Sequence, residues 1–209
     1  MSVRDVLRAE RMRLCDTLER YGPDAPTLCV GWTTADLAAH LVVRERDPRS
    51  SPGLVLGGRA AEYTNRLRLR AKARGYPWLL DRLRAGPPAF VIATMAGLNV
   101  NENWIHHEDV RRANGEAPRP ADPGIDRVLL ASLLRLGKFQ LRAVKGYGVD
   151  IVLPDGARYV LRKGGATVTL HGPVGEIVLY LSGRREAARL ELTGDPGAIE
   201  ALRTAKLGV

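Results

Sequence analysis

Cysteine is scarce in this chain of 209 residues. Only Cys15 and Cys29 are present, and neither belongs to a Cys-x-x-Cys pair. Two cysteines exclude a disulfide framework. In a cytosolic protein both are expected to be free thiols in or near the core, and a catalytic thiol is the less favoured alternative.

Long hydrophobic runs are also absent. No stretch approaches the roughly 18 consecutive apolar residues that a membrane-spanning helix needs. The first residues, Met1 to Asp5, include the polar or charged Ser2, Arg4 and Asp5 and lack the apolar core of a signal peptide. The sequence therefore predicts a cytoplasmic protein without a membrane partner.

Aromatic residues make up only 5% of the chain, which argues against a platform on which nucleic-acid bases stack. The net charge of +9 invites a nucleic-acid interpretation, but arginine outnumbers lysine by 27 to 5 and is spread along the whole length. Nucleic-acid binding is therefore the weaker hypothesis. A small anionic substrate is a better use of surplus arginine.

Histidine is rare, and two of the four histidines lie in a polar stretch, residues 101–109, inside a predicted helix that ends at Asn114-Gly115. Glu102 and His106 are four residues apart, so their side chains share one helical face. Asp109 follows three residues later on the same arc. Burial of a carboxylate and an imidazole costs several kcal/mol unless they are paired or bound to metal.

A third candidate ligand, His40, lies in another predicted helix. Thr33 and Asp36 form a capping box at its start, and Trp32 can pack on Leu37 across the first turn. His40 falls on the apolar arc that includes Leu37, so it is expected to face inward.

We hypothesise that His40, Glu102 and His106 converge on one divalent metal, with Asp109 accepting the second imidazole N–H of His106. Three protein ligands and an open position are typical of a catalytic zinc site. The alternatives are a surface hydrogen-bonded pair for Glu102 and His106 and an ordinary core histidine for His40. The remaining histidines, His107 and His171, are assigned no metal: His107 faces away, beside Trp104.

The C-terminal part has a different composition, with a strand-turn-strand pattern around Pro154-Asp155-Gly156. Further strands are expected at 166–171 and 188–192, with helices at 174–181, where a strand is the alternative, and after Asp195. The sequence predicts a mostly α protein, with a helix bundle over residues 1–145, including an amphipathic helix at 123–144, and a small α+β domain over 146–209.

Several motifs resemble the mycothiol-dependent maleylpyruvate isomerase family, part of the DinB-like superfamily of metal-binding helix bundles. The stretch from Val30 to Leu41, with Gly31-Trp32-Thr33 and His40, resembles one helix signature, and Glu-x₃-His-x₂-Asp at 102–109 resembles the second. Segments 181–185 and 192–196 resemble the family's sterol-carrier-like C-terminal domain. The resemblance implies an up-and-down four-helix bundle with zinc, or another divalent metal such as nickel or iron, on the three predicted ligands.

The resemblance also implies a function. Members use a low-molecular-weight thiol, often mycothiol, for isomerisation or S-transfer on a small electrophilic or anionic substrate. Arg44, one turn beyond His40, is the candidate catalytic residue for holding an anionic group. No arginine in the C-terminal part matches a substrate-binding motif of the family. The alternative hypothesis is a non-catalytic metal-binding protein, either a sensor or a binding module.

Overall fold

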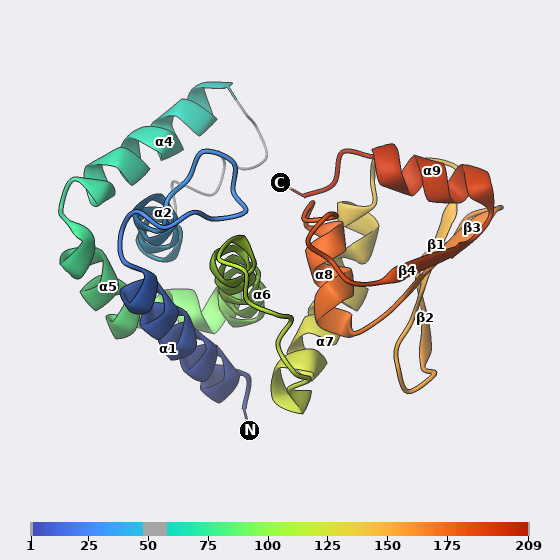
Figure 1. Cartoon of the computed structure of the whole chain (residues 1–209), viewed down its shortest axis with the longest axis horizontal. Coiled ribbons are helices and arrows are strands. Elements are labelled where there is room, and N and C mark those ends of the chain that lie inside the picture. Colours follow the sequence, from blue (N-terminus) through green and yellow to red (C-terminus); the bar gives the residue numbers. More distant parts are fainter. Residues whose placement is uncertain (1, 48–57, 209) are drawn as a thin grey trace. The chain divides into compact units, whose positions relative to one another are not determined.

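The computed structural model describes residues 2–47 and 58–208, without the side chains of residues 59–60 and 89–100. Its contacts divide the chain into two compact units, Met1–Arg119 and Pro120–Val209. Figure 1 labels their helices and strands. For residues 49–58, which are rich in serine, proline and glycine, the sequence predicts a loop, and this stretch lies almost entirely outside the described residues.

The first unit is helical. Helix α1 packs against α5 and α6, while α2 packs against α4, α5 and α6. The helices span α1 Val3–Tyr21, α2 Thr34–Arg46, α4 Gly58–Lys72, α5 Tyr76–Ala85 and α6 Ala89–Ala113.

Capping boxes begin α1 and α2, and the sequence predicts both, from Ser2 with Asp5 and from Thr33 with Asp36. The Ser2 hydroxyl accepts from the backbone N–H of Asp5, whose carboxylate accepts from the backbone N–H of Ser2. At α2, the Asp36 carboxylate accepts from both the backbone N–H and the hydroxyl of Thr33. Because these bonds satisfy groups that have no partner inside the helix, they define where each helix begins.

Helix α6 is longer than predicted. The polar stretch alone indicated a start near residue 99 or 101, but the helix begins directly after Pro88. Its last three turns carry the candidate ligands, and Val110 joins the apolar core there. The fully buried leucines of this core come from three other helices: Leu14 and Leu18 of α1, Leu37 and Leu41 of α2, and Leu79 and Leu83 of α5.

The second unit contains a four-stranded sheet in the order β2-β1-β3-β4. Strand β1 (Gly148–Val152) pairs antiparallel with β2 (Arg158–Arg162) and parallel with β3 (Thr167–His171), and β3 pairs antiparallel with β4 (Glu191–Gly194). The predicted hairpin is therefore confirmed. Strand β4 was predicted three residues too early, because its position is set by pairing with β3, in which Leu192 lies opposite Leu170.

Three helices complete this unit: α7 Pro123–Gln140, α8 Val174–Leu181 and α9 Pro196–Thr204. Every residue of α8 is buried, so its apolar run is a helix and not the alternative strand. Helix α7 packs on α8 and on β2, where a Cβ at Gly137 would meet the Leu161 side chain at 3.5 Å. Helix α9 packs on β3 and β4.

The predicted fold class, a helical N-terminal region followed by a small α+β unit, is confirmed. Helix α7 packs within the second unit, which begins at Pro120, whereas the sequence analysis placed the start of the α+β domain at residue 146. Among the described residues, no helix combines the length and the apolar character needed to cross a bilayer.

Two adjacent glycines in the second unit allow a matched test. A Cβ at Gly164 would lie 2.1 Å from the carbonyl carbon of Tyr147 and 2.2 Å from the nitrogen of Gly148, whereas Gly165 has nothing within 4 Å of such an atom. We expect Gly164→Ala to lower the free energy of unfolding by about 2 kcal/mol or more, because backbone must move. Urea titration measures this; an equal loss in Gly165→Ala would contradict the explanation.

Candidate metal and thiol site

The three residues predicted as metal ligands lie together in the first unit. One ligand atom from each of His40, Glu102 and His106 lies within 4.8 Å of the other two. His40 Nε2 is 3.5 Å from Glu102 Oε1, and the His40 and His106 rings are 5.3 Å apart between centroids. Packing of α2 against α6 brings together residues that are more than sixty positions apart in the sequence.

The contact predicted between His106 and Asp109 is present. His106 Nδ1 is 2.8 Å from Asp109 Oδ2, and Asp109 is completely buried. This bond occupies Nδ1 and leaves Nε2 as the ring nitrogen for a metal. Burial lowers the pKa of His106, but the bonds to Asp109 and Cys29 outweigh burial and raise the pKa to about 9.

Glu102 is held by two basic neighbours. Arg44 Nε donates to Glu102 Oε1 at 2.8 Å, and His40 lies on the same oxygen. Burial raises the pKa of Glu102, yet the His40 hydrogen bond and the Arg44 charge lower it to about 2. The carboxylate is therefore ionised at neutral pH. Arg44 lies beside the cluster as expected, with its guanidinium bound to a candidate ligand.

The third candidate ligand, His40, is a neutral imidazole. Burial lowers the pKa of His40, and the Glu102 hydrogen bond only partly opposes this effect. The Trp32 ring stands 5.1 Å from the His40 ring, between centroids. A neutral imidazole, a carboxylate and a second imidazole oriented by Asp109 form the His₂Glu donor set of catalytic zinc sites, so these residues fit a divalent metal.

Cys29 also lies at this cluster, which the sequence did not indicate. Its Sγ is 3.2 Å from Asp109 Oδ2 and 4.0 Å from His106 Nδ1. The backbone N–H of Leu28 donates to the backbone oxygen of Asp109 and joins this loop to α6. The one signal in the sequence for a Cys29 near the candidate ligands is its position shortly before the helix that carries His40. Cys15, by contrast, is a core residue as predicted, and burial raises its pKa to about 12.

Comparison with known proteins gives a match in structure. No protein-family model matches the chain, and no curated protein matches it. A crystal structure of the mycothiol-dependent maleylpyruvate isomerase is 18% identical, with a TM-score of 0.56 over 92% of this chain and 93% of that one. A histidine-to-alanine mutant of such an isomerase is 17% identical, with a TM-score of 0.56 over 94% of each chain.

This chain has the fold of mycothiol-dependent maleylpyruvate isomerase. The resemblance of the two helix motifs predicted that fold. The assignment of His40, Glu102 and His106 as metal ligands and the sterol-carrier-like character of the second unit stay predictions.

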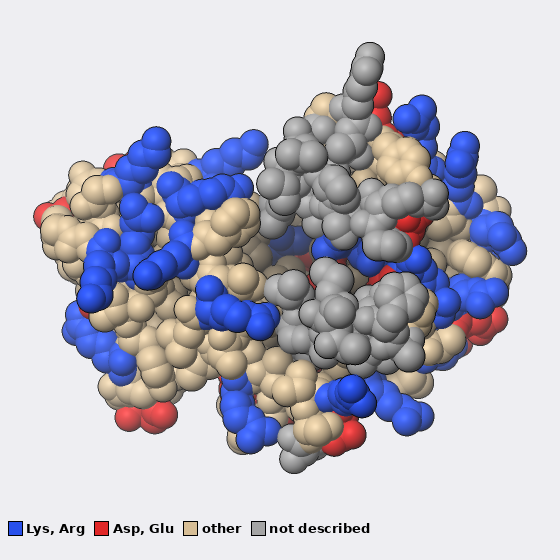
Figure 2. All heavy atoms as spheres, turned by 180° about the vertical axis from the view of Figure 1, so that it is seen from behind, with Lys and Arg blue, Asp and Glu red and all other residues tan. Residues whose placement is uncertain are grey.

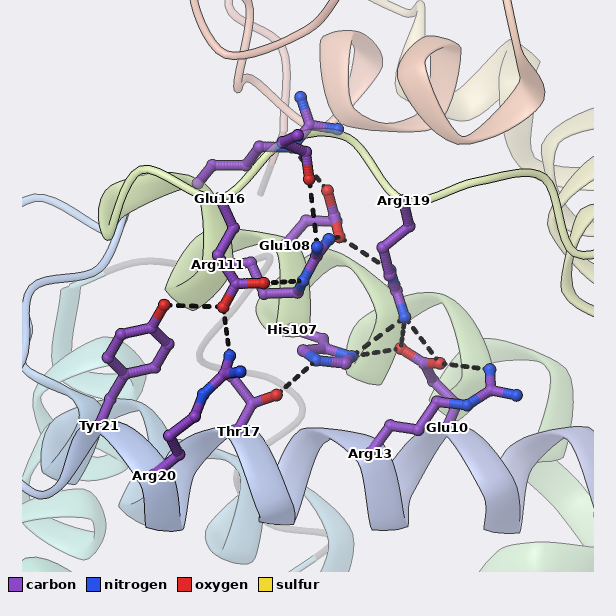
Figure 3. Close-up of polar contacts among 12 residues, drawn as sticks. Glu10, Arg13, Thr17, Arg20, Tyr21, His107, Glu108, Arg111, Glu116 and Arg119 are labelled. Carbon is purple, nitrogen blue, oxygen red and sulfur yellow. Dashed lines mark hydrogen bonds and ion pairs between the residues drawn. The ribbon is translucent and has the colours of Figure 1, made fainter.

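Within this isomerase fold, α6 is supported by buried polar contacts on the side of His107 (Figure 3). His107 Nδ1 donates to Glu10 Oε1 at 2.9 Å, and Nε2 accepts from the Thr17 hydroxyl at 2.9 Å. Arg119 Nη1 binds both oxygens of Glu10 at 2.8 and 2.9 Å. The sequence placed His107 away from the candidate metal ligands but did not indicate its partners Glu10 and Thr17 on α1.

Glu108, the next residue, is completely buried among arginines. Its carboxylate accepts from Arg111 Nη1 at 2.7 Å and from Arg112 Nε at 2.6 Å, and Arg119 Nε lies 2.8 Å away. Arg111 also donates to Glu116, so the loop after α6 is bound back to the helix (Figure 3). These contacts hold the end of α6 that carries His106.

Part of the surplus arginine therefore has internal partners. Besides the Glu108 cluster, Arg11 pairs with Glu45, and Arg68 pairs with Asp36. On the face that Figure 2 shows, the lysine and arginine side chains are spread out with other residues between them. Buried carboxylates thus account for several of the arginines, whereas the net charge of +9 comes from basic residues beyond the number of acidic ones.

His171, which was assigned no role, lies in the second unit at the end of β3. Its Nε2 is 2.8 Å from the Thr193 hydroxyl on β4. It is suited as a control histidine because this partner is independent of the metal cluster.

Glu10 provides a test of the network that supports α6. Burial raises the pKa of Glu10, but His107 and Arg119 lower it overall, so the buried carboxylate is ionised. We expect Glu10→Gln to lower the free energy of unfolding by about 3 kcal/mol, because Arg119 loses one of its two buried counter-ions. Glu19→Gln, on the exposed side of α1, should cost no more than about 1 kcal/mol. Equal losses in chemical denaturation would contradict this.

Proposed function

We propose that this chain is a metal-dependent enzyme that uses a low-molecular-weight thiol, of the mycothiol kind, for isomerisation or S-transfer on a small electrophilic or anionic substrate. The observation that carries the proposal is the convergence of His40, Glu102 and His106, with Asp109 bound to Nδ1 of His106. The structural neighbours, which are mycothiol-dependent isomerases by name, support the same class of thiol and reaction.

The proposed metal ligands are His40, Glu102 and His106, and zinc is the first candidate, with nickel and iron also compatible with the donor set. A divalent metal there would lower the pKa of a thiol bound at its open position, so that the thiolate predominates at neutral pH.

Neighbouring side chains orient the proposed ligands. Asp109 orients the His106 ring, and we assign Arg44 as a positioning residue that holds Glu102 in place. The hypothesis that Arg44 also holds an anionic group of the substrate stays a proposal. Burial of these side chains strengthens their electrostatic interactions.

The proposed isomerisation requires no oxidant. A thiolate adds to one carbon of an activated double bond, the former double bond rotates as a single bond, and expulsion of the thiolate restores the double bond. The thiol is regenerated, which is why it acts as a cofactor. In S-transfer the carbon–sulfur bond is retained, and a proton or leaving group balances the reaction.

Metal affinity should depend on pH through His106. The pKa of about 9 means that metal-free His106 carries an extra proton at neutral pH, and a metal must displace it. We expect zinc affinity to rise about tenfold per pH unit between roughly pH 7 and pH 8.5. Competition with a chelator measures it. In Asp109→Asn, which lacks the carboxylate that raises the pKa of His106, the zinc affinity should stop rising at a lower pH. A zinc affinity independent of pH in the wild type would contradict the assignment of His106 as a ligand.

Turnover and metal content together test the function. Purified protein is assayed with mycothiol and a panel of electrophiles, including maleylpyruvate, with and without zinc. We expect about one divalent ion per chain and metal-dependent turnover, both lost in His106→Ala because one of three ligands is removed.

His171→Ala is the matched control, since its histidine lies on the sheet, and it should retain the metal. A tightly bound ion without turnover on any electrophile would support the alternative, a non-catalytic metal-binding protein. Full metal content in His106→Ala would reject the proposed ligand set.

A further inference from the structure

We propose a second cation site, made by Cys29, His106 and Asp109, that takes a thiophilic divalent ion such as Cd²⁺. It lies beside the His40–Glu102–His106 set and shares one imidazole with it. The inference rests on the proposed function only through this shared residue, because the second set of ligand atoms is present whether or not the protein turns over a thiol.

The three ligand atoms are close enough to surround one ion. His106 Nδ1 is 2.8 Å from Asp109 Oδ2, which is 3.2 Å from Cys29 Sγ, and Sγ is 4.0 Å from Nδ1. Metal–sulfur bonds of about 2.3 Å and metal–nitrogen or metal–oxygen bonds of about 2.0–2.2 Å span such separations. Sulfur and nitrogen ligands favour a soft or borderline ion.

The ligands of the second site are fixed by helix α6 and by the loop before α2. Asp109 is completely buried, and its carboxylate faces the sulfur and the imidazole. The loop that carries Cys29 is fixed by the bond from Leu28 to the backbone of Asp109, and Thr27 Oγ1 accepts from the backbone N–H of Cys29. The ligands therefore need little rearrangement to meet an ion.

An ion can reach Cys29 but not the other cysteine. Cys29 is partly exposed, and the adjacent Val30 is 99% exposed, so the loop lies at the surface. Cys15 has no exposed surface and packs among leucines of the core. A signal from a metal–thiolate bond in the folded protein is thus expected from Cys29 alone.

An ion bound by Cys29, His106 and Asp109 affects metal binding at His40, Glu102 and His106. The ion displaces the thiol proton of Cys29 and the proton that His106 Nδ1 shares with Asp109, and both protons go to solvent. In the singly occupied protein the remaining ring proton lies on Nε2, the nitrogen that the first set requires. A thiophilic ion at Cys29 therefore opposes metal binding at His40, Glu102 and His106.

The test is titration of the whole protein with Cd²⁺. The measurement is the ultraviolet charge-transfer absorption that a thiolate–cadmium bond produces. We expect one such bond per chain in the wild type and in Cys15→Ala, and none in Cys29→Ser. Asp109→Asn should weaken the affinity at least about tenfold, because one ligand loses its charge. Circular dichroism shows whether each variant is folded.

His40→Ala separates this inference from the proposed function. It removes a ligand of the first set only, so the cadmium–thiolate signal should persist with equal or higher affinity. A signal that persists in Cys29→Ser, or an affinity unchanged in folded Asp109→Asn, would overturn the second site. A cadmium–thiolate bond in a protein without thiol turnover would contradict only the proposed function, and turnover without that bond would contradict only the second site.

Discussion

The structure of the first unit depends on the pairing of four consecutive polar residues, His106 to Asp109, that α6 places in or near the interior. Successive residues of a helix point about 100° apart, so these side chains face four directions. Their partners come from different places. His107 binds Glu10 on α1, and Glu108 binds arginines of the last turn of α6 and Arg119 after it. Asp109 contacts Cys29 in the loop before α2, and the His106 ring lies beside His40 of α2. An unpaired buried group would cost several kcal/mol, so the surrounding segments must converge on this turn.

That requirement links stability to the site. Contacts of His107 and Glu108 hold α6 against α1 and the following loop, and they thereby fix the rotation of the helix that presents Glu102 and His106. Asp109 then orients one imidazole. Charge is compensated locally, since Arg44 helps to keep Glu102 ionised. Elsewhere in the unit burial raises the pKa of Glu45, and its ion pair with Arg11 opposes this effect only in part.

Much of the fold could be predicted from local signals. Capping boxes at Ser2 and Thr33 indicated where two helices begin, and the turn around Asp155 indicated the β1–β2 hairpin. Elements without such signals were placed less well. Helix α6 begins earlier than its polar stretch suggested, and β4 is shifted because pairing with β3 and not composition sets its register. Helix α7 has an amphipathic pattern, which does not reveal which surface covers its apolar face.

Helical spacing by itself determined that Glu102, His106 and Asp109 share one face, since a turn of helix brings residues three and four apart together. The inward arc of His40 was also readable from the sequence. Only the tertiary structure decided that α2 brings His40 to that face, that Arg44 binds Glu102, and that the loop before α2 places Cys29 against Asp109. These contacts join residues far apart in the chain, and their geometry depends on helix packing and loop conformation, for which a periodic pattern carries no information.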